Sequence, residues 1–252
     1  MPKLKVLKAQ NPADTGRLSA DVVSELMHAQ PNCLLGLATG STPLPLYREL
    51  VLRYQQGSLD FSKVRSVNLD EYVGLPADDP QSYRYFMQKN LFQHINMDPR
   101  NARIPDGMAP DLTAECDQYE AQIAAWDGVD LQVLGIGLNG HIGFNEPAPI
   151  FTCRTHVTNL TESTRQANQR FFPDSEHVPH QAITMGVGTI MDARKILLIC
   201  AGTKKAEILE KAFFSPVDPM VPASVLQFHQ NVTVVADEGA LAIIHRKHPD
   251  VL

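Results

Sequence analysis

The sequence predicts an α/β fold, namely a three-layer, Rossmann-like domain in which an open, mostly parallel sheet carries helices on both faces. Short, continuously apolar runs alternate along the chain with segments of helical periodicity. Continuous apolar runs are typical of parallel strands that are buried on both faces. No Gly/Ser-rich or charged linker divides the 252 residues. We therefore expect residues 1–252 to form a single domain.

Six apolar runs are expected to form the strands of this sheet. Each is short and lies between segments of different periodicity, as buried strands do. The runs are Cys33–Ala38, Val64–Leu69, Leu131–Ile136, Ala182–Met185, Lys195–Ala201 and Val232–Ala236.

Five segments between these runs have the spacing of helices. In one of them Leu46, Leu50 and Tyr54 share a helical face. Its start signal is Thr42 as the expected N-cap, with Pro43 at the first helical position. The other four helices are expected at Ser19–His28, Tyr83–His94, Ala114–Ala125 and Lys204–Phe213.

The polar stretch Pro147–His180 shows neither strand nor helix periodicity over most of its length. Irregular segments this long are uncommon inside compact domains, and many of those that occur are functional lids. We expect a lid within residues 147–180.

Composition and charge exclude several classes of protein. The net charge is −6 and the pI is about 5.8, and the sequence contains no basic cluster typical of a nucleic-acid binder. No apolar run approaches the roughly 20 residues of a membrane span. The N-terminal residues resemble no signal peptide, and the four cysteines are widely spaced. We expect a reduced, cytoplasmic protein without nucleic-acid or membrane partners.

Polar clusters follow four of the expected strands. In an open α/β sheet ligands bind beyond the carboxyl ends of the strands, so these clusters should meet at one edge. They are Thr39–Thr42, Asn68–Tyr72, Gly135–Pro147 and Gly202–Lys205.

The first and last clusters are candidate phosphate-binding loops. Gly40, Ser41 and Thr42 would offer backbone N–H groups and hydroxyls at a helix N-terminus, where an anion is stabilised. The alternative interpretation is helix capping alone. Lys205 in the last cluster adds a cation. Neither cluster has the spacing of a P-loop.

The third cluster contains GxGxxG at Gly135–Gly140, which is also the spacing of a dinucleotide-binding turn. In that turn the last glycine opens a helix, whereas here Pro147 follows within seven residues of Gly140. We therefore expect a loop without a nicotinamide cofactor.

His141 and Glu146 lie in this glycine-broken loop and can fold back onto each other. A histidine exchanges protons near neutral pH, and a carboxylate orients it. The alternative is a histidine that only bonds a backbone carbonyl.

Asp70 and Glu71 end the second apolar run. One of the two carboxylates should face solvent, and the other is a candidate general base in the ligand crevice. Helix capping by an acidic residue is the alternative.

The sequence contains neither a spacing typical of a metal site nor a Gly-x-Ser-x-Gly elbow. We expect no metal and no organic cofactor.

Four segments of the chain resemble the glucosamine-6-phosphate deaminase family, the glucosamine/galactosamine-6-phosphate isomerases. The resemblance extends from about Cys33 to about Glu238 and is most specific in the second and third segments. The segments are ATGSTP at Ala38–Pro43, NLDEYVGL at Asn68–Leu75, LGIGLNGHIGFNEP at Leu134–Pro147 and STRQANQRFF at Ser163–Phe172.

The resemblance implies a cytoplasmic enzyme of amino-sugar catabolism and N-acetylglucosamine utilisation, in which an aldose–ketose isomerisation releases ammonia. Glucosamine 6-phosphate would become fructose 6-phosphate. Asp70 would move a proton between C2 and C1 through an enolamine, and His141, oriented by Glu146, would assist ring opening. The phosphate would be held by Gly40, Ser41, Thr42, Arg170 and Lys205.

Two positions depart from patterns found among family members. Asn139 stands where some members have an aspartate that forms a triad with His141 and Glu146. An amide can orient an imidazole but cannot stabilise its charge, so Glu146 should set the pKa of His141. His156 and Thr158 replace basic residues that bind a phosphorylated activator in some members, so we expect weak or absent activation.

Several alternatives stay open at this stage. A galactosamine-6-phosphate deaminase would use the same groups, and a hydrolase of the 6-phosphogluconolactonase type would need the same phosphate loops and histidine. The chain is accordingly expected to be a hydrolase as well as an isomerase. A sugar-phosphate sensor without catalysis would need neither the base nor the proton shuttle. A homo-oligomer is compatible with the sequence.

Overall fold

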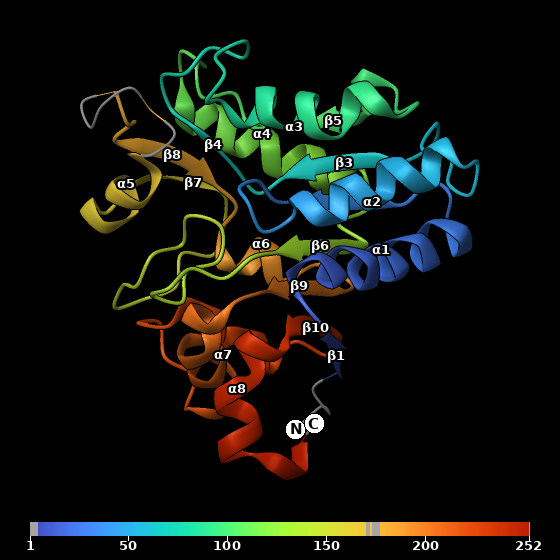
Figure 1. Cartoon of the computed structure of the whole chain (residues 1–252). Coiled ribbons are helices and arrows are strands. Elements are labelled where there is room, and N and C mark those ends of the chain that lie inside the picture. The colour runs from blue at the N-terminus through green and yellow to red at the C-terminus, as the bar shows by residue number, and fades with distance from the viewer. Residues whose placement is uncertain (1–4, 170–171, 173–176, 252) are drawn as a thin grey trace.

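The computed structural model describes residues 5–169, 172 and 177–251. Its largest element is a seven-stranded sheet in the order β1-β10-β9-β6-β2-β3-β5, in which all neighbouring strands run parallel (Figure 1). The strands are β1 (Lys5–Ala9), β2 (Leu34–Leu37), β3 (Arg65–Asn68), β5 (Ala102–Arg103), β6 (Leu131–Leu134), β9 (Ile196–Cys200) and β10 (Val232–Asp237). The expected mostly parallel sheet is confirmed, and five of the six apolar runs lie in it.

The sixth run forms β8 (Gln181–Thr184) in a separate sheet. There it lies between β4 (Asp70–Tyr72) and β7 (His156–Asn159), antiparallel to both. The expectation that this run belongs to the main sheet is therefore wrong. A short apolar run does not specify its partner, and the partner here is the chain that leaves the main sheet after β3.

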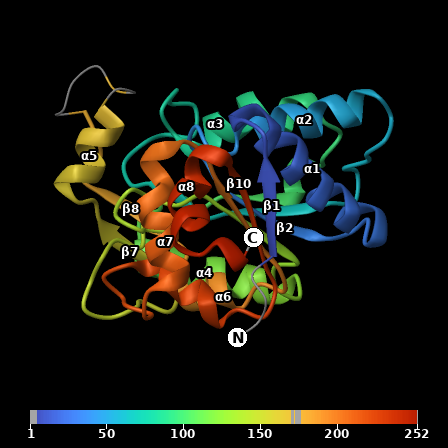
Figure 2. The same cartoon turned by 60° about the horizontal axis from the view of Figure 1, so that its bottom comes forward.

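The helices cover both faces of the main sheet. Figure 2 shows α1, α2 and α3 on one side and α4 and α6 on the other. This follows from right-handed crossovers, since the chain first moves across the sheet in one direction and then returns. The ranges are α1 (Pro12–Ala29), α2 (Leu44–Gln55), α3 (Tyr83–Asn90), α4 (Leu112–Ala125) and α6 (Val187–Met191).

Two further helices, α7 (Ala206–Phe214) and α8 (Glu238–Lys247), pack against each other beside β10. In Figure 1 the small sheet and α5 (Glu162–Asn168) lie at the opposite side of the molecule. Short 3-10 segments occupy Phe92–His94, Pro99–Asn101, Thr203–Lys205, Pro222–Phe228 and Pro249–Val251.

Three helices differ slightly from their expected bounds: α4 begins at Leu112 rather than Ala114, α7 at Ala206 rather than Lys204, and α3 ends at Asn90 rather than His94. The starts of α1 and α2 differ in their caps. α1 begins seven residues before Ser19, because Asn11 is its N-cap and accepts a hydrogen bond from the amide of Asp14 at 3.0 Å. The expectation that Thr42 caps the second helix is wrong. Pro43 is in the N-cap position of α2, which has no side-chain cap, so the Thr42 hydroxyl does not serve this helix.

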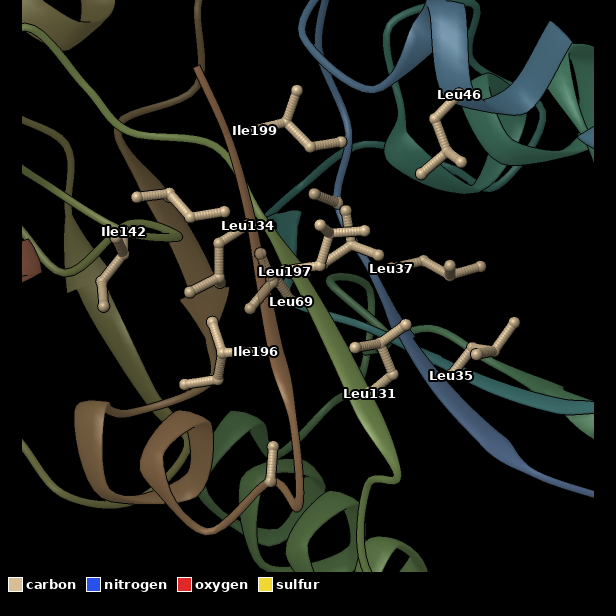
Figure 3. Packing of buried hydrophobic residues seen from close by; sticks show 14 of the residues in the cluster. Leu35, Leu37, Leu46, Leu69, Leu131, Leu134, Ile142, Ile196, Leu197 and Ile199 are labelled. Carbon is tan, nitrogen blue, oxygen red and sulfur yellow. The ribbon is translucent and has the colours of Figure 1, made fainter. Parts of the chain in front are cut away.

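The core lies between the main sheet and its helices. Figure 3 shows Leu35, Leu131, Leu134 and Leu197, from three neighbouring strands, as members of one hydrophobic cluster. Each of these leucines is at most 1% exposed. Burying a leucine side chain contributes roughly 1.5–3 kcal/mol to the stability of the fold. The packing of these strands therefore stabilises the part of the sheet whose carboxyl ends carry the polar clusters.

The stretch from residue 147 to 180 is not a purely irregular loop as expected, because β7 and α5 form within it. β7 acquires its structure by pairing with β8, and such a long-range partner cannot be read from local periodicity. Within the described residues we find no helix with both the length and the apolar content of a membrane span.

Candidate active site

The four polar clusters meet at one edge of the sheet. The strands that precede them, β9, β6, β2 and β3, are adjacent in that order. The loop after β2 touches the end of β6, since a Cβ placed on Gly135 would lie 3.7 Å from the side chain of Thr42. The loop after β9 touches it as well, because Lys205 Nζ donates to the carbonyl of Ile136 at 2.5 Å. The expected convergence is confirmed.

The two candidate phosphate loops lie on either side of the β6 end. Gly40 has a φ of +89°, which glycine adopts without strain, and apart from Gly40 and its two chain neighbours no described residue lies within 4 Å of the position a Cβ would occupy. Ser41 is exposed beside this open space. Gly202 also has a φ of +89°, and its amide donates to both carboxylate oxygens of Asp237.

Lys205 is the cation at this edge. Burial lowers the pKa of its ammonium group, while the nearby Cys200 acts in the opposite direction. Within the described chain its ammonium group donates one hydrogen bond, to the carbonyl of Ile136. The group can therefore bond an anion while it stays attached to the end of β6.

Asp70 is the first residue of β4 and is 6% exposed. Burial, followed by the charge of Glu71, raises the pKa of its carboxyl group to about 8. Within the described chain its carboxylate receives no hydrogen bond. A buried carboxylate that lacks donors is a strong base when it is ionised.

Glu71 is also buried, at 3% exposed, so the expectation that one of the two adjacent acids faces solvent is wrong. The chain leaves the main sheet at Leu69 and becomes β4, an edge strand of the small sheet that pairs with β8. Glu71 accepts hydrogen bonds from the backbone amides of Tyr72, Tyr83 and Arg84 at 2.8–2.9 Å. Two of these amides begin α3, so Glu71 is the helix-capping acid of the pair.

His141 lies in a loop whose glycines bring the backbone close to its ring. A Cβ on Gly137 would lie 2.5 Å from three ring atoms of His141, so only glycine fits there. Gly143 has a φ of +57°, and a Cβ on it would lie 3.6 Å from Oδ2 of Asp70. The loop is fixed to β8, because the amide of Phe144 donates to Thr184 Oγ1 at 3.1 Å. The structure thus brings the His141 loop against Asp70.

The expected pair of His141 and Glu146 is present. Nδ1 of His141 lies 3.5 Å from Oε2 of Glu146, in an ion-pair contact that is not aligned as a hydrogen bond. Asn139 Nδ2 donates to the same carboxylate oxygen at 2.6 Å, and Oε1 accepts a short hydrogen bond from the Thr164 hydroxyl. Burial alone would raise the pKa of Glu146, but His141, Thr164 and Asn139 together lower it to about 2.

Asn139 contacts Glu146, and its Oδ1 also accepts from the amide of His141 at 3.2 Å. The Asn139 side chain therefore holds both His141 and Glu146 in place. Thr164, on α5, was not singled out from the sequence, although it lies in the STRQANQRFF segment. Its contact with Glu146 forms only because α5 packs against the His141 loop. Arg170, the remaining expected phosphate ligand, lies outside the described residues.

Three aromatic rings pack behind the candidate site and were not predicted from the sequence. Tyr72, Tyr83 and Phe144 have ring centroids 4.7–6.0 Å apart. They form a second small core with Leu160 and Ala182. This core holds β4, α3 and the His141 loop together.

As expected, no helix begins at the GxGxxG spacing. Turns follow Gly140 instead. Among the described residues no group of three or more His, Cys, Asp and Glu side chains has the arrangement of a metal site.

This combination of an open parallel sheet with acid–base groups at its carboxyl edge defines an α/β enzyme of the acid–base type. The chain belongs to the family of glucosamine-6-phosphate isomerases/6-phosphogluconolactonase, whose sequence model matches residues 10–235.

Several relatives are similar over nearly the whole chain. A glucosamine-6-phosphate deaminase of Lachnoclostridium phytofermentans is 52% identical over 92% of this chain and 98% of its own length. One of Geobacillus sp. is 50% identical over 96% of both chains. A solved structure described as a monomeric glucosamine-6-phosphate deaminase is 44% identical, with a TM-score of 0.93 over 95% of this chain and all of its own.

Solved 6-phosphogluconolactonases share the fold alone. The enzyme from Trypanosoma brucei is 20% identical, with a TM-score of 0.75 over 97% of this chain and 100% of its own. The expectation of a hydrolase is therefore corrected: the relatives with about 50% identity are named deaminases, and the lactonases are distant.

Proposed function

We propose that this chain is an amino-sugar-phosphate deaminase that converts glucosamine 6-phosphate to fructose 6-phosphate and ammonia. The observation that carries the proposal is Asp70, a buried carboxylate without hydrogen-bond donors in the described chain, held against the loop of the His141–Glu146 pair. A proton shuttle between two carbons needs such a base beside a separate acid–base group. Near-complete coverage of relatives named glucosamine-6-phosphate deaminase supports the substrate.

In the proposed reaction His141 first opens the sugar ring by moving a proton from O1 to the ring oxygen. Glu146 orients the imidazole for this step, and Asn139 holds Glu146 and the backbone amide of His141. Asp70 then removes the proton from C2, which gives an enolamine, and returns it to C1. Water then adds to the resulting C2 iminium, and ammonia leaves as the C2 ketone of fructose 6-phosphate forms.

The substrate phosphate is proposed to bind at Gly40, Ser41, Thr42, Lys205 and Arg170. The open space beside Gly40 and the ammonium group of Lys205 support this assignment. Amides and cations around an anion give charge-assisted hydrogen bonds, which are stronger than neutral ones.

A lid is proposed within residues 147–180, because the Thr164 hydroxyl of α5 donates to Glu146 of the site. A cytoplasmic location and a small-molecule substrate as the main partner complete the proposal. The acid–base groups carry the reaction without an assigned metal or organic cofactor.

The test is ammonia release with coupled detection of fructose 6-phosphate, using glucosamine 6-phosphate and galactosamine 6-phosphate in parallel. We expect turnover of the first sugar and a loss of at least about 10²-fold in Asp70→Asn. Turnover of the galactosamine ester alone would keep the chemistry and replace the substrate. No turnover of either by the folded protein would refute the proposal.

A further inference from the structure

We infer that Thr164 is a positioning residue that locks Glu146 and thereby fixes the imidazole of His141, so that the acid–base pair is complete only when α5 lies on the site. The inference rests on the proposed function for its kinetic test but not for its spectroscopic one.

The carboxylate of Glu146 is held on both oxygens. Oε1 accepts from the hydroxyl of Thr164, and Oε2 accepts from Asn139 and faces His141. The Glu146 side chain is 8% exposed and Thr164 is 6% exposed, so water cannot readily replace a lost donor. Removing one of the two donors leaves a buried carboxylate oxygen without a partner, which costs the desolvation free energy of that group.

The donors come from different parts of the fold. Asn139 belongs to the same loop as Glu146, whereas Thr164 lies 18 residues further on, in α5. The Asn139 contact therefore forms with the loop itself. The Thr164 contact forms only when α5 has docked.

The hydroxyl of Thr164 is itself oriented. Thr161, the N-cap of α5, donates to Thr164 Oγ1 at 3.1 Å. Thr164 Oγ1 thus receives one hydrogen bond and directs its own proton to Glu146. The start of α5 and the carboxylate are linked by two consecutive hydroxyls.

A second contact ties α5 to the other half of the site. Asn168 Nδ2 donates to the hydroxyl of Tyr72 at 3.0 Å, and Tyr72 belongs to β4 together with Asp70. One helix therefore contacts both the strand that carries the proposed base and the carboxylate that orients the histidine. This arrangement suits a segment that completes the site after substrate has entered.

The tautomer of His141 follows from this geometry. Nδ1 faces the Glu146 carboxylate, so the neutral ring should carry its proton on Nδ1 and leave Nε2 free to accept one. If Thr164 holds the carboxylate in place, removing its hydroxyl should disturb the tautomer even without substrate.

The experiment compares Thr164→Val, which keeps the shape, with Thr164→Ser, which keeps the hydroxyl. The matched control is Thr155→Val. Thr155 is 7% exposed and donates to the carboxylate of Glu120 at 2.6 Å, so it loses the same kind of bond away from the site. Each variant is measured for kcat, for KM with glucosamine 6-phosphate and for the nitrogen-15 shifts of the imidazole, assigned with His141→Gln.

We expect Thr164→Val to lower kcat roughly tenfold or more, the effect of losing a hydrogen bond to a charged group, with KM within about twofold. The nitrogen-15 shifts of His141 in this variant should move away from the values of the Nδ1–H tautomer. Thr164→Ser should restore both values, and Thr155→Val should match the wild type.

An unchanged kcat and tautomer in Thr164→Val would overturn the inference, as would equal losses in Thr164→Val and Thr155→Val. If the wild type shows no turnover, the proposed function fails. The nitrogen-15 shifts then decide the positioning role by themselves.

Discussion

Asp70 and Glu71 are adjacent, buried carboxylates with opposite hydrogen bonding: Glu71 accepts three backbone amides, whereas no described group donates to the carboxylate of Asp70. Alternation along β4 turns the two side chains to opposite faces of the strand. One face meets the N-terminus of α3, and the other meets the His141 loop. The fold therefore gives the Glu71 carboxylate a structural role and leaves the Asp70 carboxylate for the proposed chemical role.

The raised pKa of Asp70 predicts a pH-dependent stability. The folded protein keeps the proton on this carboxyl group up to about pH 8, while the unfolded chain loses it near its ordinary value of 3.8. Stability from this group is thus complete below about pH 4 and is lost as the pH rises towards 8. Relative to Asp70→Asn, the free energy of unfolding of the wild type should fall by up to ~1.4 kcal/mol per pH unit across that window.

Urea denaturation at several pH values measures this difference. Asp78→Asn, which changes an exposed carboxylate, serves as the control and should parallel the wild type. A constant difference between wild type and Asp70→Asn from pH 4 to pH 8 would contradict the raised pKa.

Glu146 should show the opposite dependence. Its pKa is lowered from 4.5 to about 2, so its ionised form stabilises the fold above about pH 4.5. This contribution, of order 3 kcal/mol, is lost as the pH falls to about 2. Glu146→Gln should be less stable than the wild type at pH 7, and the gap should narrow in acid. A gap that does not change with pH would rule out the lowered pKa.

Gly137 should not tolerate a side chain. In Gly137→Ala the new methyl group would lie 2.5 Å from the His141 ring and displace it, so kcat should fall roughly tenfold or more. Gly135→Ala is the matched control, because its methyl group would meet Thr42 at an ordinary 3.7 Å. Steady-state kinetics on both variants, with circular dichroism to verify folding, checks the prediction. Equal activity of the two alanine variants would contradict the displacement.

Lys205→Met should raise KM for the sugar phosphate about tenfold or more and should weaken inhibition by inorganic phosphate, because a charge-assisted bond to the phosphate is lost. The neighbouring Lys204 is exposed, so Lys204→Met is the control and should leave KM unchanged. If the two variants gave the same KM, Lys205 would not be a phosphate ligand.

Activation by N-acetylglucosamine 6-phosphate is expected to be weak or absent. His156 and Thr158 lie on β7, and Nδ1 of His156 is 2.9 Å from the carbonyl of Arg154. Neither residue supplies the permanent positive charge that would bind a phosphate. Rate curves with and without the compound measure this, and a clear loss of sigmoidicity on its addition would contradict the prediction.

The sequence predicted the main sheet well, because its central strands are short apolar runs that need burial on both faces. It also predicted that the candidate site residues gather at one edge of the sheet. Asp70, His141, Glu146 and Lys205 each follow a parallel strand, and parallel strands end at the same edge. Periodicity and strand-end chemistry are local properties, so they could be read directly from the sequence.

Three of the errors share one physical cause, which is that they depend on contacts between segments far apart in the sequence. The run at Ala182–Met185 pairs with β4 and not with the main sheet, and β7 forms only because β8 lies beside it. Glu71 is buried because α3 places its first amides on it. None of these partners is close in sequence.

The sequence by itself thus determined the fold class, the edge at which the chemistry gathers, and the residue types available there. Only the tertiary structure decided which carboxylate lacks hydrogen-bond donors in the described chain, and which hydroxyl holds Glu146. Asp70 and Glu71 are the same kind of group one residue apart, and Thr164 is one of five threonines between residues 147 and 180. Burial and hydrogen bonding differ among them because the packing of β4, α3 and α5 gives each side chain a different set of neighbours.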